Sequence, residues 1–456
     1  MSSQLENQKL NLLWHNMIIF STVDQVIQES IQRLKSYNQD MMYRNRDMAI
    51  DYYTFNNTAK YIDQYFDGSL QEEIPLYPVN MTSRLINRIS LVYKDAPIRT
   101  VENDKYEELT IMKNSKMKYF ERIHNLLGTT AIQIGWQDDR FKYQPIINFQ
   151  PIFDYDDPLK PVAITYLLPK ATADVYSYSE PDMFMYWDKD NHFIFDEKGK
   201  IISVNDDDVN PYGVLPFVFV QPVTMIDEFW NDGAMDIPLA NCQVDIAMTM
   251  LQHHIRSAGG QWVVEGRIDA NEVQLGLNKI LAVEGGSVNN ISAGVNIESI
   301  MSGIKFQLQQ VAQNHHITFD FGMSGSKSGI ALRMENLELL EAREDEVEKW
   351  KFIEKEMYSI EKSIAEVEAT VNLPDDMKIN YDEVDFPDAE MEMQEWEWKF
   401  KHGLADRIDY LMAKDPDGFS SREEAEKYLA ERNISATNVK QQSNVKENAF
   451  ILNRDV

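Results

Sequence analysis

The sequence is poor in cysteine, in basic residues and in long apolar runs, and each shortage excludes a class of protein. A single cysteine, Cys242, stands among the 456 residues. No disulfide can therefore form within the chain, as expected for a protein that assembles in a reducing cytoplasm. No apolar run approaches the ~20 residues of a membrane-spanning helix, and the opening MSSQLENQKL lacks the basic segment of a secretory signal. We therefore expect a soluble protein with no membrane partner.

The shortage of basic residues gives the chain a strong net charge. Lys and Arg number 44 against 74 Asp and Glu, which leaves a formal charge of -30 at pH 7. A surface this acidic repels phosphate and disfavours a conventional DNA-binding protein with a basic face. It still permits a protein that touches nucleic acid without gripping it, through localised basic residues inside an acidic shell.

What remains is ordinary for a chain with large cores. Apolar residues make up 43% and charged residues 26% of the sequence, which excludes disordered and collagen-like proteins. At roughly 150 residues per domain, the length predicts about three domains.

The first half of the chain alternates helical and strand patterns. Apolar residues at helical spacing predict helices over residues 22–36 and 80–93. The second is predicted to stop before Pro97, because a proline pushes the preceding residue out of the helical region. Between residues 128 and 223, short aromatic and β-branched runs predict strands in TAIQIGW, PIINF, VAITYLL, VYSYS, MFMYW and PFVFV.

From residue 230 the pattern changes to long helices. Asp236, followed by Ile-Pro, predicts the N-cap of a helix that ends near Ala258, before two glycines. Strand-like QWVVEGRI and KILAVEG follow, with turns rich in Gly and Asn, and then a helix over residues 297–316.

A small-residue loop, GMSGSKSG (322–329), precedes a long helix predicted over residues 330–371. The apolar residues of this helix step by 3 and 4, so one face is continuously apolar. Between Glu335 and Glu368, twelve acidic residues stand against five basic ones. We therefore expect the polar side of the helix to be strongly acidic.

The C-terminal part is predicted to be mostly helical. KINYDEVDF (378–386) predicts a short strand, and residues 388–414 are helical in pattern. Two overlapping capping boxes in SSREE (420–424) start a last helix. The sequence beyond Asn433 is polar and without period, so we expect a mobile tail.

The loop GMSGSKSG invites comparison with a phosphate-binding P-loop, because it lies between a strand-like and a helical segment. A P-loop needs a glycine immediately before its lysine and a second glycine five residues earlier, so that backbone N–H groups surround phosphate. Ser326 and Phe321 occupy these two positions. We therefore interpret the loop as a bending connection and not as a nucleotide site.

Paired histidines, His253-His254 and His315-His316, suggest a metal site. Adjacent residues point about 100° apart on a helix, so neither pair can share one ion. If the two helices are antiparallel neighbours, the pairs lie at opposite ends, roughly 27 Å apart at 1.5 Å per residue. We therefore interpret them as surface or interface histidines.

Other chemistry-bearing patterns are equally weak. The acidic runs DYDDP (154–158) and NDDDVN (205–210) lack the spaced ligands of a Ca²⁺ loop. Cys242 lies mid-helix without a nearby histidine in sequence, which favours a packed thiol over a nucleophile. We predict no catalytic residue, no metal and no cofactor, and therefore no enzyme.

The order of these elements resembles the portal (head-to-tail connector) proteins of tailed bacteriophages, particularly the siphophage type. NMTSRLINRISLVYKDAPIRT (80–100) is similar to an early helix that ends in a Tyr and a Pro, and NPYGVLPFVFVQP (210–222) to a Gly-x-x-Pro strand. WNDGAMDIPLANCQVDI (230–246) is similar to the start of the first stem helix, and SGSKSGIALRMENLELLEAR (324–343) to the tunnel loop and helix. The resemblance covers residues 76–430. The first 75 residues match no part of it, and the long C-terminal barrel helix of some podophage members is absent.

The resemblance implies a mixed α+β fold, a portal-like subunit with an α/β wing, a two-helix stem, a small β-containing clip, a long tunnel helix and a helical crown. Its implied parts are the N-terminal helices and wing (1–230), stem helix 1 (231–258), clip (259–296), stem helix 2 (297–317), tunnel loop (318–331), tunnel helix (332–371), wing strand (372–387), crown (388–432) and tail (433–456).

The resemblance also implies a function. Rings of about twelve subunits would occupy one capsid vertex of the virion, after assembly in the host cytoplasm, and provide the channel for packaging and ejection of double-stranded DNA. Implied partners are the packaging ATPase (terminase large subunit), a head-completion adaptor and the major capsid protein, with a scaffolding protein as a further candidate.

The site residues that the resemblance implies fall in two segments. The tunnel loop would contact DNA non-specifically through Met323, Ser324, Gly325, Ser326, Lys327 and Ser328. The clip would dock partners through Trp262, Val264, Arg267 and Lys279.

Two other classes of protein remain open. One is a metal-dependent hydrolase that uses the Asp-rich loops and the histidine pairs, which metal analysis and a nuclease and phosphatase panel would detect. The other is an intracellular scaffold built on coiled-coil pairing of the long helix, whose apolar stripe runs only about three to four heptads. A dimer or trimer would favour the scaffold, and a closed ring of about a dozen subunits would favour the portal.

Overall fold

The computed structural model describes residues 18–19, 22–35, 41–66, 76–157, 159–169, 181–204, 207–221, 229–257, 261–265, 287–291, 297–317, 337–382, 389–414 and 421–431. The chain forms two units. The first comprises residues 1–319 and 338–384, and the second residues 320–337 and 385–456. The described elements confirm the predicted mixed α+β class, and none of their helices has the length and apolar character to cross a membrane.

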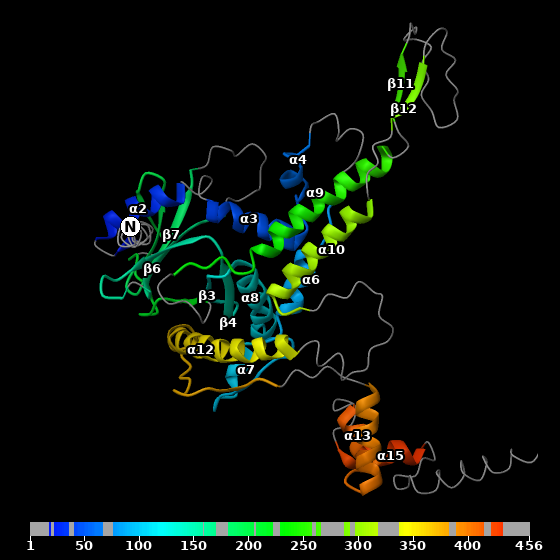
Figure 1. The fold of residues 1–456 in the computed structure, drawn as a ribbon. Helices are drawn as coiled ribbons and strands as arrows, with labels where there is room; N and C mark the ends of the chain where they lie inside the picture. The colour runs from blue at the N-terminus through cyan, green and yellow to red at the C-terminus, as the bar shows by residue number, and fades with distance from the viewer. Residues whose placement is uncertain are drawn as a thin grey trace, which may run out of the picture. The chain divides into compact units, whose positions relative to one another are not determined.

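A six-stranded sheet forms one part of the first unit (Figure 1). Its strands, in spatial order, are β1 (Ile18–Ile19), β5 (Phe149–Phe153), β6 (Pro161–Leu167), β7 (Met183–Asp188), β8 (His192–Asp196) and β9 (Ile201–Ser203). All neighbours are antiparallel except β1 and β5. Helix α2 (Val23–Lys35) covers one face, because its apolar stripe packs against strand residues such as Ile152 and Phe184.

A three-stranded antiparallel sheet lies beside the first. Its order is β10 (Phe217–Val220), β3 (Thr130–Gln137) and β4 (Arg140–Ile146). Alternate residues of β4, including Phe141 and Tyr143, are buried in a core with the long helix α12 (Leu337–Glu368). The apolar stripe that the sequence shows on α12 is therefore its packed face.

Several shorter elements complete this core. They are α7 (Lys105–Leu109), α8 (Lys113–Leu127) and the two-stranded sheet of β2 (Ile98–Thr100) and β13 (Lys378–Asn380). The predicted strand 378–386 is thus three residues long within the described part of the chain.

A bundle of helices forms the other part of the first unit. Its members are α3 (Met41–Thr54), α4 (Ala59–Asp63), α6 (Thr82–Ile89), α9 (Asp236–Ser257) and α10 (Ile297–Asn314). Helix α9 contacts all four of the others. The predicted bounds of α9 agree with the structure to one residue, since Asp236-Ile-Pro and the following glycines are strong local signals.

A small hairpin lies between α9 and α10 in the chain. Strands β11 (Gln261–Glu265) and β12 (Ser287–Ile291) pair antiparallel. Three residues separate α9 from β11, and five separate β12 from α10. The strand β12 corrects the prediction of a Gly- and Asn-rich turn there, because its five residues pair in register with the β-branched QWVVE.

The second unit is described by three helices, α13 (Ala389–His402), α14 (Arg407–Lys414) and α15 (Arg422–Glu431). The helical pattern predicted over residues 388–414 is confirmed by α13 and α14. The chain breaks between them, because Gly403 has φ +68° and ends α13. Asp406 then caps α14 by accepting hydrogen bonds from the backbone N–H groups of Ile408 and Asp409. Ser421 accepts the N–H of Glu424, as one predicted capping box requires.

Helix α6 is shorter than predicted. It ends at Ile89 and not at Tyr93, because the carboxylate of Glu121 accepts the backbone N–H groups of Val92 and Tyr93. These N–H groups are therefore unavailable to a longer helix, and the acceptor lies 28 residues further along the chain, where no local signal reveals it.

Candidate functional site

Helices α9 and α10 are antiparallel, and polar contacts hold the base of the pair. The Oδ1 atom of Asp236, at the start of α9, lies 2.8 Å from Nε2 of His315, which follows α10. Burial acts to raise the pKa of Asp236, but hydrogen bonds from His315 and Asn314 outweigh it and lower that pKa. His315 thus lies at the opposite end of α9 from His253 and His254, as the sequence predicts for antiparallel neighbours.

A ladder of three polar side chains on α9 holds the segment of the chain that leads into α6. Asn241, Asp245 and Thr249 are spaced by four residues and therefore share one face of the helix. They form hydrogen bonds with the backbone of residues 77–82. Thr249 Oγ1 accepts the N–H of Tyr77 (3.1 Å), and Asp245 Oδ1 accepts the N–H of Val79 (2.8 Å). Asn241 donates from Nδ2 to the carbonyl oxygen of Val79 (2.8 Å) and accepts the N–H of Thr82 at Oδ1 (3.0 Å). The last bond caps α6 from across the bundle.

The ladder carries a carboxyl group whose titration is shifted. Burial raises the pKa of Asp245 to about 7, although hydrogen bonds from Val79 and Asn241 act to lower it. The repeat of polar residues on an otherwise apolar helix is a signal from which the sequence analysis could have found this ladder.

Two glycines fix the junction between α8 and the start of α9. Gly128 (φ +71°) ends α8, and a Cβ there would lie 2.1 Å from the carbonyl oxygen of Asn231. Gly233 (φ +56°) lies equally close to α8, since an added Cβ there would lie 2.3 Å from the backbone nitrogen of Gly128. Thr129 closes the junction by donating from its N–H to Asn231 O (3.1 Å) and accepting the N–H of Asn231 at Oγ1 (3.0 Å).

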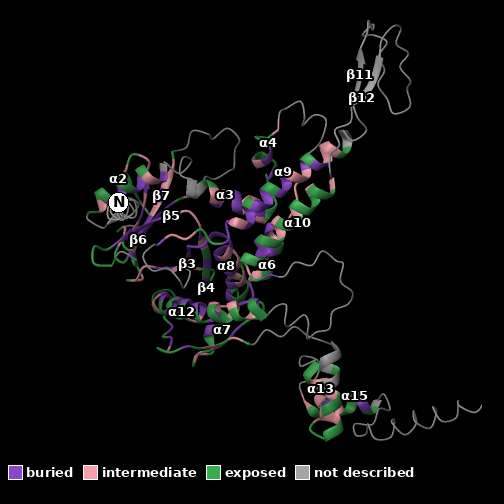
Figure 2. Ribbon diagram, viewed as in Figure 1, coloured by how far each residue is buried: buried purple, intermediate pink, exposed green. Residues whose placement is uncertain are grey.

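Large apolar side chains are exposed along the helix pair. Within α10, buried residues are confined to Val311 and Ala312, near its end, and Figure 2 shows the rest of that helix as exposed or intermediate. The exposed apolar side chains of the pair are Leu239, Met250 and Ile255 on α9 and Met301 and Phe306 on α10, with Phe306 63% exposed. Surfaces of this kind mark interaction sites.

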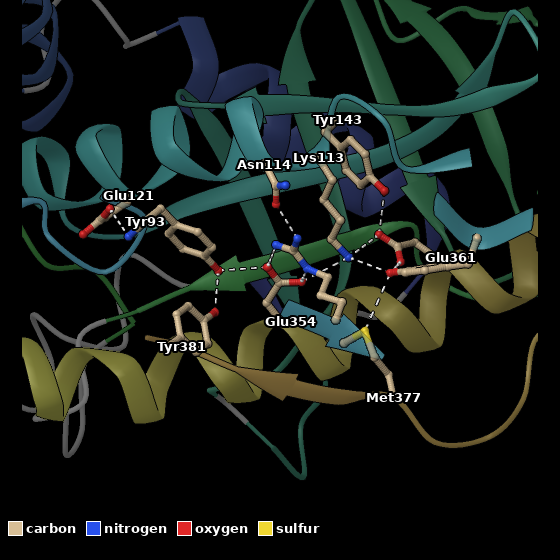
Figure 3. A network of polar contacts seen from close by, with 11 residues as sticks. Tyr93, Lys113, Asn114, Glu121, Tyr143, Glu354, Glu361, Met377 and Tyr381 are labelled. Carbon is tan, nitrogen blue, oxygen red and sulfur yellow. Dashed lines mark hydrogen bonds and ion pairs between the residues drawn. The ribbon is translucent and has the colours of Figure 1, made fainter. Parts of the chain in front are cut away.

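The long helix α12 is fastened to the α/β body by buried charges, as Figure 3 shows. The side chains of Glu354 and Glu361 are fully buried. Lys113 Nζ lies 3.1 Å from Glu354 Oε2 and 2.7 Å from Glu361 Oε1, and Arg99 pairs with Glu354. Burial acts to raise the pKa of Glu354, but Lys113 and Arg99 outweigh it and lower that pKa to about 2.

Tyrosines complete the hydrogen bonding of both carboxylates. Tyr106 and Tyr143 each donate to Glu361 at 2.7 Å, and Tyr93 donates to Glu354 at 3.0 Å. Each carboxylate is therefore surrounded by donors and closed to solvent. The arrangement anchors α12 and offers no access for a substrate.

A second polar contact joins α12 to α8. Lys349 Nζ lies 2.9 Å from His124 Nε2, and His124 Nδ1 lies 2.7 Å from the carbonyl oxygen of Gly128. Because a carbonyl only accepts, His124 carries its proton on Nδ1 and accepts from Lys349 at Nε2. Burial, and then Lys349, hold the pKa of His124 well below its usual value. This contact links α12 to the glycine junction below α9.

The exposed side of α12 is acidic, as predicted, but three charged residues of the helix do not belong to it. Glu354, Glu361 and Lys349 are buried and paired, so they belong to the packed face. The acidic residues that remain on the outside include Glu341, Glu344, Asp345 and Glu348.

The predicted site residues lie mostly outside the described residues. Those of the tunnel loop, Met323 to Ser328, all do, and so do Arg267 and Lys279 of the clip. Trp262 and Val264 lie on β11, opposite Asn290 and Val288 of β12.

Within the described residues, no group of three or more His, Cys, Asp or Glu side chains is arranged to hold a metal ion. Cys242 is buried in a cluster with Met48 and Tyr52, where burial raises the pKa of its thiol. This position agrees with its interpretation as a packed thiol.

Comparison with known proteins gives only distant likenesses. No family profile matches the sequence, and no curated protein matches it. A chain in a solved structure of the neck of an empty gene transfer agent particle, computed with sixfold symmetry, is 10% identical with a TM-score of 0.41, covering 81% of this chain and 94% of that one. A chain in the virion of a native gene transfer agent particle is 11% identical with a TM-score of 0.39, covering 81% and 93%. TM-scores below 0.5 do not establish a shared fold.

Proposed function

We propose that this chain is the subunit of a portal ring in a tailed phage-like particle, in which about twelve copies surround a channel for double-stranded DNA. The observation that carries the proposal is the α9–α10 pair, which is fixed at its base and exposes Leu239, Met250, Ile255, Met301 and Phe306. A helix pair with this surface is suited to packing by neighbouring subunits, and a repeated head-to-tail contact closes into a ring. The resemblance of the sequence to portal proteins supports the same conclusion.

In this proposal α9 and α10 form the stem, and the segment 259–296 with its hairpin forms the clip that docks the packaging ATPase and the head-completion adaptor. The segment 318–331 is the tunnel loop, and α12 is the tunnel helix that its buried charges join to the wing. The second unit supplies the crown. The ring stands at one vertex of the capsid, with the major capsid protein around the wing, and its role is structural and not enzymatic.

The charge of the chain suits passage of DNA. A net charge of -30 per subunit makes a channel wall that repels phosphate, so DNA slides without being trapped. Lys327 adds one phosphate contact per subunit, worth about 1 kcal/mol or less when exposed and screened. Gly322, Gly325 and Gly329 allow backbone conformations around it that other residues disfavour.

A charge reversal in the loop tests the channel assignment. Lys327→Glu rings should assemble as the unaltered protein does but package or retain less DNA in a reconstituted packaging reaction. Lys198→Glu, at an exposed lysine beside β8, changes the net charge equally and should package normally. Equal packaging by both variants would contradict the assignment.

Replacement of the clip tests its docking role separately. A Gly-Ser linker in place of residues 262–283 should leave the wing folded and abolish binding of the packaging ATPase or the adaptor. Unchanged binding of both partners would refute this part of the proposal.

A further inference from the structure

Two neighbouring helices of the first unit carry an unusual charge for this chain. Helices α6 and α8 contact each other, and their outward charged side chains are all basic: Arg84 and Arg88 on α6, and Lys116, Lys118 and Arg122 on α8. The one acidic residue of the two helices, Glu121, is buried and bonded to backbone N–H groups. In a chain of charge -30, this surface is a local exception.

Neutral hydrogen-bonding groups lie among these cations. Tyr53 of α3, which contacts both helices, donates from its hydroxyl to Asn87 Oδ1 of α6 at 3.1 Å. Burial raises the pKa of Tyr53, and Arg122 acts in the opposite direction, which places the two side chains together. Tyr119, one turn before Arg122 on α8, is 40% exposed. Hydroxyl, amide and guanidinium groups therefore share one surface, which we call the α6–α8 basic surface.

The geometry of the two helices sets the spacing of the charges. Arg84 and Arg88 on α6, like Lys118 and Arg122 on α8, are four residues apart and thus about 6 Å apart along each helix. Packed helices lie roughly 8–10 Å apart. The cations of each helix therefore lie about one turn apart, and guanidinium groups are well suited to bind phosphate oxygens. Lys118 Nζ donates one hydrogen bond to the carbonyl oxygen of Lys94 at 3.2 Å and keeps two further N–H donors.

We propose that the α6–α8 basic surface binds the sugar–phosphate backbone of double-stranded DNA, as a contact distinct from the tunnel loop; the inference rests on the proposed function, which brings DNA to this protein. Arginine, lysine, tyrosine and asparagine side chains supply most protein contacts to phosphates, and such contacts carry no sequence preference. A few of them on each subunit, repeated around a ring, would hold packaged DNA weakly and in a salt-dependent way.

The test is the salt dependence of duplex binding by the full chain, followed by fluorescence anisotropy with a labelled 30-base-pair duplex. Each cation that contacts phosphate adds about one unit to the slope of log affinity against log salt. The variant Arg84→Ala/Lys118→Ala should therefore lower the slope by about two, and the conservative Arg84→Lys/Lys118→Arg should restore it. Lys198→Ala/Lys200→Ala removes two exposed lysines beside β8 and should leave the slope unchanged.

Several results would overturn the proposal. One is the absence of measurable duplex binding by the unaltered protein, and another is an equal slope for the two alanine variants. A third is the loss of oligomer in Arg84→Ala/Lys118→Ala. That loss would assign the surface to an acidic partner such as a second copy of the chain. Oligomer mass is measured in the same samples. The protein could also show a slope change confined to Arg84→Ala/Lys118→Ala without ever forming rings. This result would support DNA binding at the α6–α8 basic surface and contradict the proposed ring.

Discussion

Helices α12 and α10 belong to the same unit but differ in how far their side chains are buried and paired within the chain. Helix α12 buries its apolar face together with Glu354 and Glu361, and partners from the same chain match both charges. Helix α10 buries only Val311 and Ala312 among its described residues and leaves Phe306 exposed. Helix α12 is completed within one subunit, whereas in the proposed ring α10 is completed by a neighbour.

The largest expected effect comes from breaking the buried network of α12. Glu354→Ala leaves the buried Arg99 without its counter-charge and leaves Lys113 with Glu361 alone. We expect a loss of about 3–5 kcal/mol in the free energy of unfolding. Urea denaturation measures it. Lys60→Ala removes an exposed pair with Asp51 and should cost about 1 kcal/mol or less. Similar losses for both variants would contradict the anchoring role of the network.

The glycine junction below α9 should be nearly as sensitive. Gly128→Ala combines a positive φ with a Cβ 2.1 Å from Asn231 O, so we expect a loss of at least about 2 kcal/mol. Gly213 is the matched control, because its φ is +63° and nothing lies within 4 Å of an added Cβ. Gly213→Ala should cost about 1 kcal/mol, from backbone strain alone. Equal thermal shifts in the two variants would show that the close approach is unimportant.

The stability of the protein should depend on pH through two buried carboxyl groups, Glu121 on α8 and Asp245 on α9. Burial raises the pKa of Glu121 and of Asp245 to about 7. Because both bind protons more tightly in the folded state, stability should fall by about 1–2 kcal/mol as pH rises from 6.5 to 8. Below that window the depressed pKa of His124 acts in the opposite direction. Glu121→Gln should flatten this decline in urea titrations across that range. A stability that rises with pH in this window would contradict the shifts.

The network of α12 predicts the opposite slope at lower pH. The pKa of Glu354 is lowered to about 2 from an ordinary 4.5, so its contribution is present above pH 4.5 and lost as pH falls toward 2. Glu354→Gln should therefore reduce the acid sensitivity between pH 4.5 and 2, with the same denaturation assay as readout.

The smallest effect on stability is expected at the surface of α10. Phe306→Asp alters a side chain that is 63% exposed, so the unfolding free energy of the subunit should change by about 0.5 kcal/mol or less. The same variant should abolish assembly, because it places a charge where a neighbour packs in the proposed ring. Gln309→Asp, on an exposed position of the same helix, adds the same charge without removing an apolar side chain and should assemble.

Local signals explain which parts of the fold the sequence predicts. The cap at Asp236 and the glycines after Ser257 bound α9 within a few residues, and alternation marks strands such as β3 and β4. Long-range partners explain the failures. Glu361 looks like one more surface acid until Lys113, 248 residues away, is brought beside it. The early end of α6 has the same kind of cause in Glu121.

The candidate site also contains features that the local sequence indicates and features that depend on distant residues. The apolar, many-sided character of α9 indicates a helix packed by several partners, and the structure supplies α3, α4, α6 and α10 around it. The ladder of Asn241, Asp245 and Thr249 depends on residues 77–82, which lead into α6 more than 150 residues earlier in the chain. The tunnel-loop residues and two of the clip residues lie outside the described residues, so their roles stay predictions.

Native mass spectrometry of the purified full chain at micromolar concentration tests the central claim most directly. If α10 is completed by neighbours in a portal ring, the unaltered protein should give one closed oligomer of about twelve subunits, and Phe306→Asp should give folded single subunits. A monomer for the unaltered protein, or a dimer or trimer that Phe306→Asp leaves intact, would contradict the account.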